Sequence, residues 1–244
     1  MQIETELLSE NESRDAQPSV PGDSIEHIQS EVRNQIPFDC SKIVAQWNAD
    51  SQYHIESQGE APFVVILGES HDDKVEMQKQ EELIAALNSD YVLHEFGGAF
   101  QYSSSLQYWG EQAGRGVSPN DSPGVPRRFV ELANEKGFDI IGCDLTQMEQ
   151  DRSTERRKKA RGESYDKNRA GLYFFDDESI AARDVHMAEK IAYYRKLSNK
   201  PIVVILGARH GRNILSQNLL AQKKIGCILI DQLEKKEREQ VSSN

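Results

Sequence analysis

The sequence predicts an α/β domain whose mainly parallel sheet is flanked by helices, and two observations lead to this fold class. First, short and strongly apolar runs, each typical of a strand buried on both faces, alternate with segments of helical periodicity. Second, residues 64–71 and 203–210 are identical at six of eight positions, and in both a strand ends in Gly-x-x-His. A helix and a further apolar strand follow each copy, which indicates a duplicated βαβ unit.

The first half of the chain contains one such unit. Residues 43–47 have the spacing of a short amphipathic helix, and the apolar run 63–67 is typical of a buried strand. Asp72 is a suitable cap for the next helix, because apolar residues recur on one face of 75–87. Residues 91–96 then supply the second strand, which completes strand, helix and strand within about thirty residues.

Two polar segments interrupt the elements that follow. Residues 97–124 are rich in Gly, Ser, Asn and Pro, yet they contain aromatic side chains, which favours a lid or binding loop. Residues 146–178 are strongly charged, and we expect them to form an excursion from the core. The remaining pattern predicts helices over 125–136, 180–197 and 214–223 and strands over 138–143, 202–206 and 226–230.

The composition predicts a leader, one domain and a short tail. Residues 1–35 contain eight acidic and two basic side chains, so they carry six of the eleven net negative charges, and a disordered acidic leader is expected. Residues 36–234 are expected to form a single domain and 235–244 a polar tail. The leader lacks the pattern of a signal peptide, and no later run is long enough to cross a bilayer. We therefore expect a cytoplasmic protein without a membrane span.

Net charge and cysteine content argue against nucleic-acid binding, a disulfide framework and a zinc knuckle. A net charge of −11 argues against nucleic-acid binding, because phosphate neutralisation requires a basic face. The basic run 156–161 is interpreted as a solvated helix face or loop. The three cysteines are odd in number and far apart, which fits neither a disulfide framework nor a zinc knuckle.

Polar residues gather at the predicted strand ends. His71 and His210 end the two Gly-x-x-His motifs, and Glu95, Asp144 and Asp231 lie at the ends of other strands. Because the carboxyl ends of parallel strands share one edge of a sheet, we expect these side chains to lie close together. Two imidazoles and a carboxylate suit a divalent metal such as zinc or manganese. Without a metal, one histidine would be the general base and Glu95 the acid or orienting partner, so both schemes stay open.

These motifs resemble those of the superfamily that joins the Tiki metalloproteases, the TraB/PrgY proteins, the erythromycin esterases and the ChaN-type haem-binding proteins. The resemblance rests on Gly-Glu-x-His-Asp at 68–72, His-Glu at 94–95, Arg-Asp-x-x-Met-Ala at 183–188 and Gly-x-x-His at 207–210. It covers residues 60–231, about 70% of the chain. The motifs are most similar to those of the ChaN-like and erythromycin-esterase branches.

The resemblance implies that His71, Glu95 and His210 belong to the active site, with Glu69 and Arg183 as companions. In the protease branch such residues hold a divalent metal, in the esterase branch a histidine activates water, and in the ChaN branch the fold is linked to haem. We therefore expect a hydrolase of an ester, lactone or amide bond with a small-molecule or peptide substrate. In this hypothesis His71 is the base or a metal ligand, Glu95 is the acid or a ligand, and His210 is the second imidazole. Arg183 holds the oxyanion or a substrate carboxylate.

Two alternatives to a hydrolase stay open. The first is a haem or small-ligand binding protein of the ChaN type without catalysis, which would use the aromatic loop 97–124. The second is an interaction protein, with the acidic leader and the basic run 156–161 as its docking segments.

Overall fold

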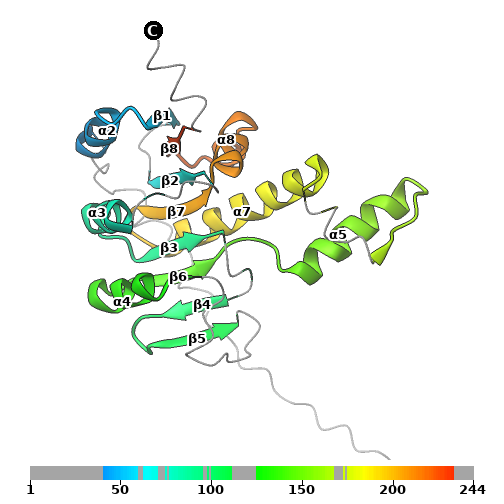
Figure 1. Cartoon of the computed structure of the whole chain (residues 1–244), viewed down its shortest axis with the longest axis horizontal. Helices are drawn as coiled ribbons and strands as arrows, with labels where there is room; N and C mark the ends of the chain where they lie inside the picture. The colour runs from blue at the N-terminus through cyan, green and yellow to red at the C-terminus, as the bar shows by residue number, and fades with distance from the viewer. Residues whose placement is uncertain are drawn as a thin grey trace, which may run out of the picture. The chain divides into compact units, whose positions relative to one another are not determined.

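An eight-stranded sheet with the strand order β1-β8-β2-β7-β3-β6-β4-β5 is the centre of the computed structural model (Figure 1). The structure describes residues 41–59, 63–70, 75, 77–95, 98, 100–111, 125–167, 173 and 175–233, without the side chains of Ser41, Ile43 and Glu111. All of them lie within one unit, Pro37–Asn244. The acidic leader expected at 1–35, the tail expected at 235–244 and His71 lie outside the described residues.

The five central strands of this sheet are parallel. They are, in spatial order, β8 (Cys227–Gln232), β2 (Val64–Glu69), β7 (Ile202–Gly207), β3 (Tyr91–His94) and β6 (Asp139–Gly142). At one edge β1 (Tyr53–Gln58) pairs antiparallel with β8, and at the other β4 (Phe100–Ser103) and β5 (Tyr108–Glu111) form an antiparallel hairpin beside β6. Every residue of β2, β7 and β8 is buried, as their unbroken apolar runs predict.

Helices cover both faces of the sheet and confirm the predicted fold class (Figure 1). Side chains alternate along each strand, so Val65 and Leu67 face one helix layer while Val64 and Ile66 face the other. The first layer consists of α2 (Ser41–Asn48), α3 (Met77–Leu87) and α4 (Arg127–Lys136), and the second of α7 (Asp177–Leu197) and α8 (Ala208–Ser216). Helix α5 (Gln147–Ala160) packs against α7, and a 3₁₀ turn at Ala221–Lys223 precedes β8.

The strand order interleaves the two halves of the chain. Strand β7 lies between β2 and β3, and β2 lies between β7 and β8. The segment β2–α3–β3 therefore crosses over β7, and the segment β7–α8–β8 crosses over β2 in the opposite direction. Helix α3 lies on one face of the sheet and α8 on the other. This is the arrangement that two right-handed crossovers require. The duplication of the unit itself stays a prediction.

The prediction of a lid or binding loop over 97–124 is wrong for its first part, because β4 and β5 extend the sheet there. Tyr102 and Trp109 are buried within the hairpin, with ring centroids 5.1 Å apart. The Tyr102 hydroxyl also donates a hydrogen bond to Asn134 Oδ1 of α4 at 2.8 Å. The aromatic side chains are thus core residues that attach an edge hairpin to a helix. Residues 112–124 lie outside the described residues.

The charged segment 146–178 begins with the helix α5. Thr146 and Glu149 form a capping box at its start, which satisfies backbone N–H groups that a helix otherwise leaves unpaired. The basic run near its end forms ion pairs, among them Lys158 and Arg161 with Glu163. Arg156, Lys159 and Arg161 of the run are exposed, whereas the Lys158 side chain is 17% exposed, so the run forms a solvated face only in part.

The helix predicted over 214–223 begins earlier and is shorter. Helix α8 starts at Ala208, directly after β7, and ends at Ser216. Asn218 then adopts a positive φ of 56°, which a helix interior does not accommodate. The early start places the second Gly-x-x-His histidine, His210, inside the first turn of α8.

Candidate functional site

The polar residues of the candidate site lie where the parallel strands end. Glu69 ends β2, Glu95 follows β3, Asp144 follows β6 by two residues, and His210 lies in the helix that follows β7. The helix after β7 covers one face of the sheet, whereas the helix after the neighbouring β2 covers the other. At such a point a crevice opens beside the carboxyl ends of the strands, and ligands of open α/β sheets bind there.

Arg183, in the second turn of α7, joins two buried carboxylates. Its Nη2 donates to Glu95 Oε1 at 2.8 Å and to Asp144 Oδ2 at 2.7 Å, and its Nε donates to both oxygens of Asp144 at 3.0 Å. The three side chains are 5%, 7% and 9% exposed, so solvent screens these charges little.

The charges of this cluster depend on one another. Burial raises the pKa of Asp144, and the hydrogen bonds and positive charge of Arg183 offset part of that rise. Burial alone would lower the pKa of Arg183, but its bonds to Asp144 and the charges of Asp144 and Glu95 outweigh burial and raise it. Removal of the guanidinium would therefore leave two carboxylates buried without their cation.

Glu95 is also fixed by the backbone of the neighbouring strand. Its Oε2 accepts a hydrogen bond from the N–H of Gly207 at 2.5 Å, while its own N–H donates to the carbonyl oxygen of Ile205 at 3.0 Å. Hydrogen bonds to both carboxylate oxygens favour the charged form of the side chain. Glu95 therefore presents a negative charge between the ends of β3 and β7.

His210 is oriented by a fully buried carboxylate. Its Nδ1 is hydrogen-bonded to Asp184 Oδ1, and Asn213 Nδ2 donates to the other Asp184 oxygen at 2.8 Å. A carboxylate only accepts hydrogen bonds, so it favours the tautomer with the proton on Nδ1. The other ring nitrogen, Nε2, faces Glu95 and lies 3.5 Å from its Oε1. A ring held in this way is suited to accept a proton.

The structure brings together three of the five predicted site residues, namely Glu95, Arg183 and His210. The described hydrogen bonds of Glu69 lead to the start of the α3 region instead. Its Oε1 accepts from Gln80 Nε2 at 2.7 Å and from the N–H of Val75 at 3.2 Å. These bonds connect the end of β2 to the segment that follows residues 71–74, which lie outside the described residues.

Sequence reasoning assigned no role to Asp184 or Asn213. A signal for Asp184 exists in the periodicity of α7, because it shares a buried helix face with Met187, Ala188 and Ile191. A carboxylate within such an apolar stripe requires a hydrogen-bonding partner. Asn213 lies three residues after His210, on the next turn of α8, and no comparable signal distinguishes it.

Helix α8 approaches the sheet closely at Gly211, the residue after His210. A Cβ at this position would lie 2.7 Å from Leu229 Cδ1 and 3.5 Å from Ile66 Cγ2, both in buried strands. We expect Gly211→Ala to lower the free energy of unfolding by about 1–2 kcal/mol, because overpacking against the buried Leu229 outweighs the gain in helix propensity of roughly 1 kcal/mol. Urea denaturation measures this loss.

Gly110→Ala is the matched control for this substitution. Its Cβ would meet Tyr108 Cε1 at 3.7 Å, an ordinary contact, so we expect a change within about 0.5 kcal/mol. Equal stabilities of the two variants would contradict the close approach of α8 that places His210.

Comparison of the chain with protein-family models, with curated proteins and with solved structures found no match in any of the three. The resemblance to the Tiki, erythromycin-esterase and ChaN superfamily therefore rests on the motifs quoted above and stays a prediction. Within the described residues, His, Cys, Asp and Glu side chains form no group of three or more that could hold a metal ion. Among the same residues, no helix has the length and apolar character needed to span a bilayer.

Proposed function

We propose that the protein is a hydrolase that acts on an ester, lactone or amide bond and uses His210 as its general base. The observation that supports this most is the pair formed by His210 and the buried Asp184 at the carboxyl ends of the strands. A buried carboxylate in this position orients the imidazole and stabilises the imidazolium that forms after proton transfer.

In this scheme Nε2 of His210 removes a proton from water while the water oxygen forms a bond to the carbonyl carbon of the substrate. The carbonyl electron pair moves to its oxygen and gives a tetrahedral oxyanion. The oxyanion then re-forms the carbonyl, the bond to the alcohol or amine leaving group breaks, and His210 returns the proton to that group. The histidine is neutral again at the end of the cycle.

Glu95 and Arg183 have supporting roles in this proposal. Because both oxygens of Glu95 accept hydrogen bonds, we favour it as the negative partner of the imidazolium over the alternative role of general acid. The Nε and Nη2 atoms of Arg183 donate to two carboxylates. We therefore assign Arg183 to the positioning of Glu95, in place of the oxyanion contact that the sequence suggested.

The metal-dependent alternative would use His71, Glu95 and His210. Of the donors that are described, Glu95 Oε1 lies 2.8 Å from the Arg183 guanidinium, and a cation so close does not fit a divalent metal on the same oxygen. Stoichiometric zinc or manganese in the purified protein, lost in a His71→Ala, His210→Ala double variant, would select the metal-dependent scheme.

We expect His210→Ala to lower kcat/KM for 4-nitrophenyl acetate by about 10²–10⁴-fold, the usual contribution of a general base. His54→Ala, an exposed histidine on β1, is the control and should retain the wild-type rate within about twofold. Release of 4-nitrophenolate measures both.

Dihydrocoumarin and acetanilide extend the assay to a lactone and an amide. If the wild type and His210→Ala act equally on all three probes, the hydrolase proposal is wrong. A Soret shift on titration with haem would then favour the ligand-binding alternative.

A further inference from the structure

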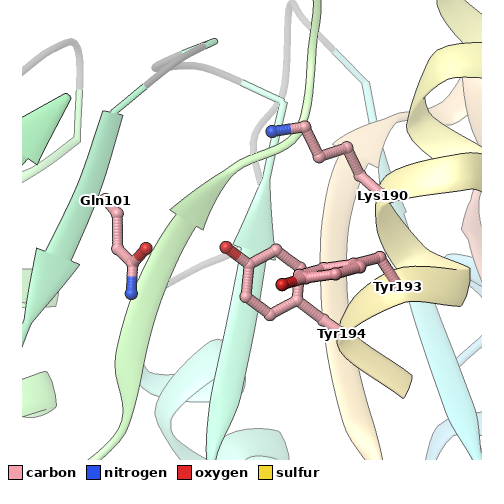
Figure 2. Close-up of a pocket in the computed structure, with 4 residues that line it drawn as sticks. All are labelled: Gln101, Lys190, Tyr193 and Tyr194. Atoms are coloured by element: carbon pink, nitrogen blue, oxygen red, sulfur yellow. The ribbon is translucent and has the colours of Figure 1, made fainter. Parts of the chain in front are cut away.

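A pocket of about 410 Å³ opens on the α7 side of the sheet, lined by Gln101, Lys190, Tyr193 and Tyr194 (Figure 2). Its volume lies within the range of about 300–1,000 Å³ that is usual for sites of small molecules. Lys190 comes seven residues after Arg183, which is about 10 Å along the helix axis. The described residues that line the pocket do not include those of the candidate site.

The fold produces this pocket because the edge hairpin extends the sheet beyond α7. Tyr102 faces α4, so its neighbour Gln101 points to the opposite face of the sheet, the face that α7 covers. Figure 2 shows Lys190 and both tyrosines reaching from α7 toward Gln101 on β4. The pocket is thus bounded by α7 on one side and by β4, the inner strand of the hairpin, on the other.

The tyrosine that forms the base of the pocket is firmly packed. Tyr194 is 6% exposed, and its ring lies 5.0 Å from that of Tyr91 on β3. Tyr193 is 57% exposed and packs edge to face on Tyr194, with ring centroids 5.2 Å apart. One ring is therefore fixed, while the other is available to a ligand as an aromatic wall.

The described lining residues combine one basic side chain with neutral polar groups. Lys190 carries the ammonium group and is half-buried; burial lowers its pKa, and the nearby acidic groups of Cys143 and Glu149 offset part of that lowering. The phenol hydroxyls of Tyr193 and Tyr194 and the amide of Gln101 both donate and accept hydrogen bonds. A ligand that matches these groups carries one negative charge, a flat apolar body and a polar substituent.

We propose that this pocket binds a small aromatic carboxylate. The carboxylate contacts Lys190 Nζ, the aromatic ring lies against Tyr193, and a ring hydroxyl hydrogen-bonds to Gln101. The site does not depend on the proposed hydrolase activity, because its residues and its test are separate from those of His210.

Titration of the full-length chain with 4-hydroxybenzoate, followed by calorimetry, tests the proposal. Binding to the wild type is expected, and Lys190→Gln should raise Kd about tenfold or more, since it removes a hydrogen bond between two charged groups. Lys196→Gln changes an exposed lysine in the last turn of the same helix and should leave Kd within about twofold. The neutral probe 4-hydroxybenzyl alcohol should bind the wild type about tenfold more weakly.

A second variant separates the aromatic part of the site from its charge. Tyr193→Leu should weaken the binding of 4-hydroxybenzoate several-fold but leave the binding of acetate unchanged. Because Tyr193 is exposed, the variant should keep the wild-type stability. The proposal is overturned if the wild type does not bind 4-hydroxybenzoate or if Lys190→Gln binds it as well as the wild type. It is equally overturned if acetate binds as tightly as the aromatic acid, which would indicate a simple anion site.

Discussion

Arg183→Met is expected to destabilise the protein by about 3–5 kcal/mol, because it leaves Glu95 and Asp144 buried without their cation. The loss should depend on pH. Burial raises the pKa of Asp144 above its ordinary value of 3.8, and without Arg183 that pKa rises further. A raised carboxyl pKa means that the folded state binds more protons than the unfolded state. The contribution of Asp144 to stability is therefore most favourable below pH 3.8 and is lost as the pH rises through the folded-state pKa.

The deficit of Arg183→Met relative to the wild type should consequently be larger at pH 7 than at pH 5. Guanidinium chloride denaturation at both values measures it. Arg127→Met is the control, because Arg127 is 94% exposed in its ion pair with Glu131 and should contribute less than about 1 kcal/mol. A loss equal to that of the control would show that the cluster does not hold the site together.

Asp184→Asn should reduce the hydrolysis of 4-nitrophenyl acetate about 10²–10⁴-fold while it preserves the shape of the side chain. An asparagine amide can donate to Nδ1 of His210, which would move the imidazole proton to Nε2 and remove the base. The tautomer is visible in the ¹⁵N chemical shifts of the imidazole ring, so this prediction has a readout that needs no substrate.

Asp177→Asn, an exposed acidic residue in the first turn of the same helix, provides the comparison. It should leave both the rate and the ring shifts unchanged. If Asp184→Asn keeps the wild-type tautomer and the wild-type rate, the buried carboxylate does not orient the base.

The fold class could be predicted because buried parallel strands have a local signature. The apolar runs of β2, β7 and β8 are long enough to be recognised one at a time, without knowledge of their neighbours. Their order could not be predicted, since it depends on pairings between residues far apart in the chain. The hairpin at 100–111 was misread for a related reason: Tyr102 and Trp109 pack on a helix that the local pattern does not reveal.

The candidate site could likewise be predicted only in part. Glu95 and His210 could be placed together because topology brings the carboxyl ends of parallel strands to one edge. Asp144 lies at such an end too, but its ion pair with Arg183 depends on how α7 packs across the sheet. The role of Asp184 also depends on how α7 packs, because the sequence does not show which histidine this face of the helix contacts.

The interleaved strand order also has a consequence for the chain as it leaves the ribosome. In the described sheet β2 pairs with β7 and β8. Val64 therefore cannot pair until Ile202, which is 138 residues later in the chain, has been synthesised. At about 5–20 residues per second, that interval lasts roughly 7–28 s. During this time the most apolar strand of the first half has neither of its hydrogen-bonding partners, and nascent-chain chaperones are the natural protection against its aggregation.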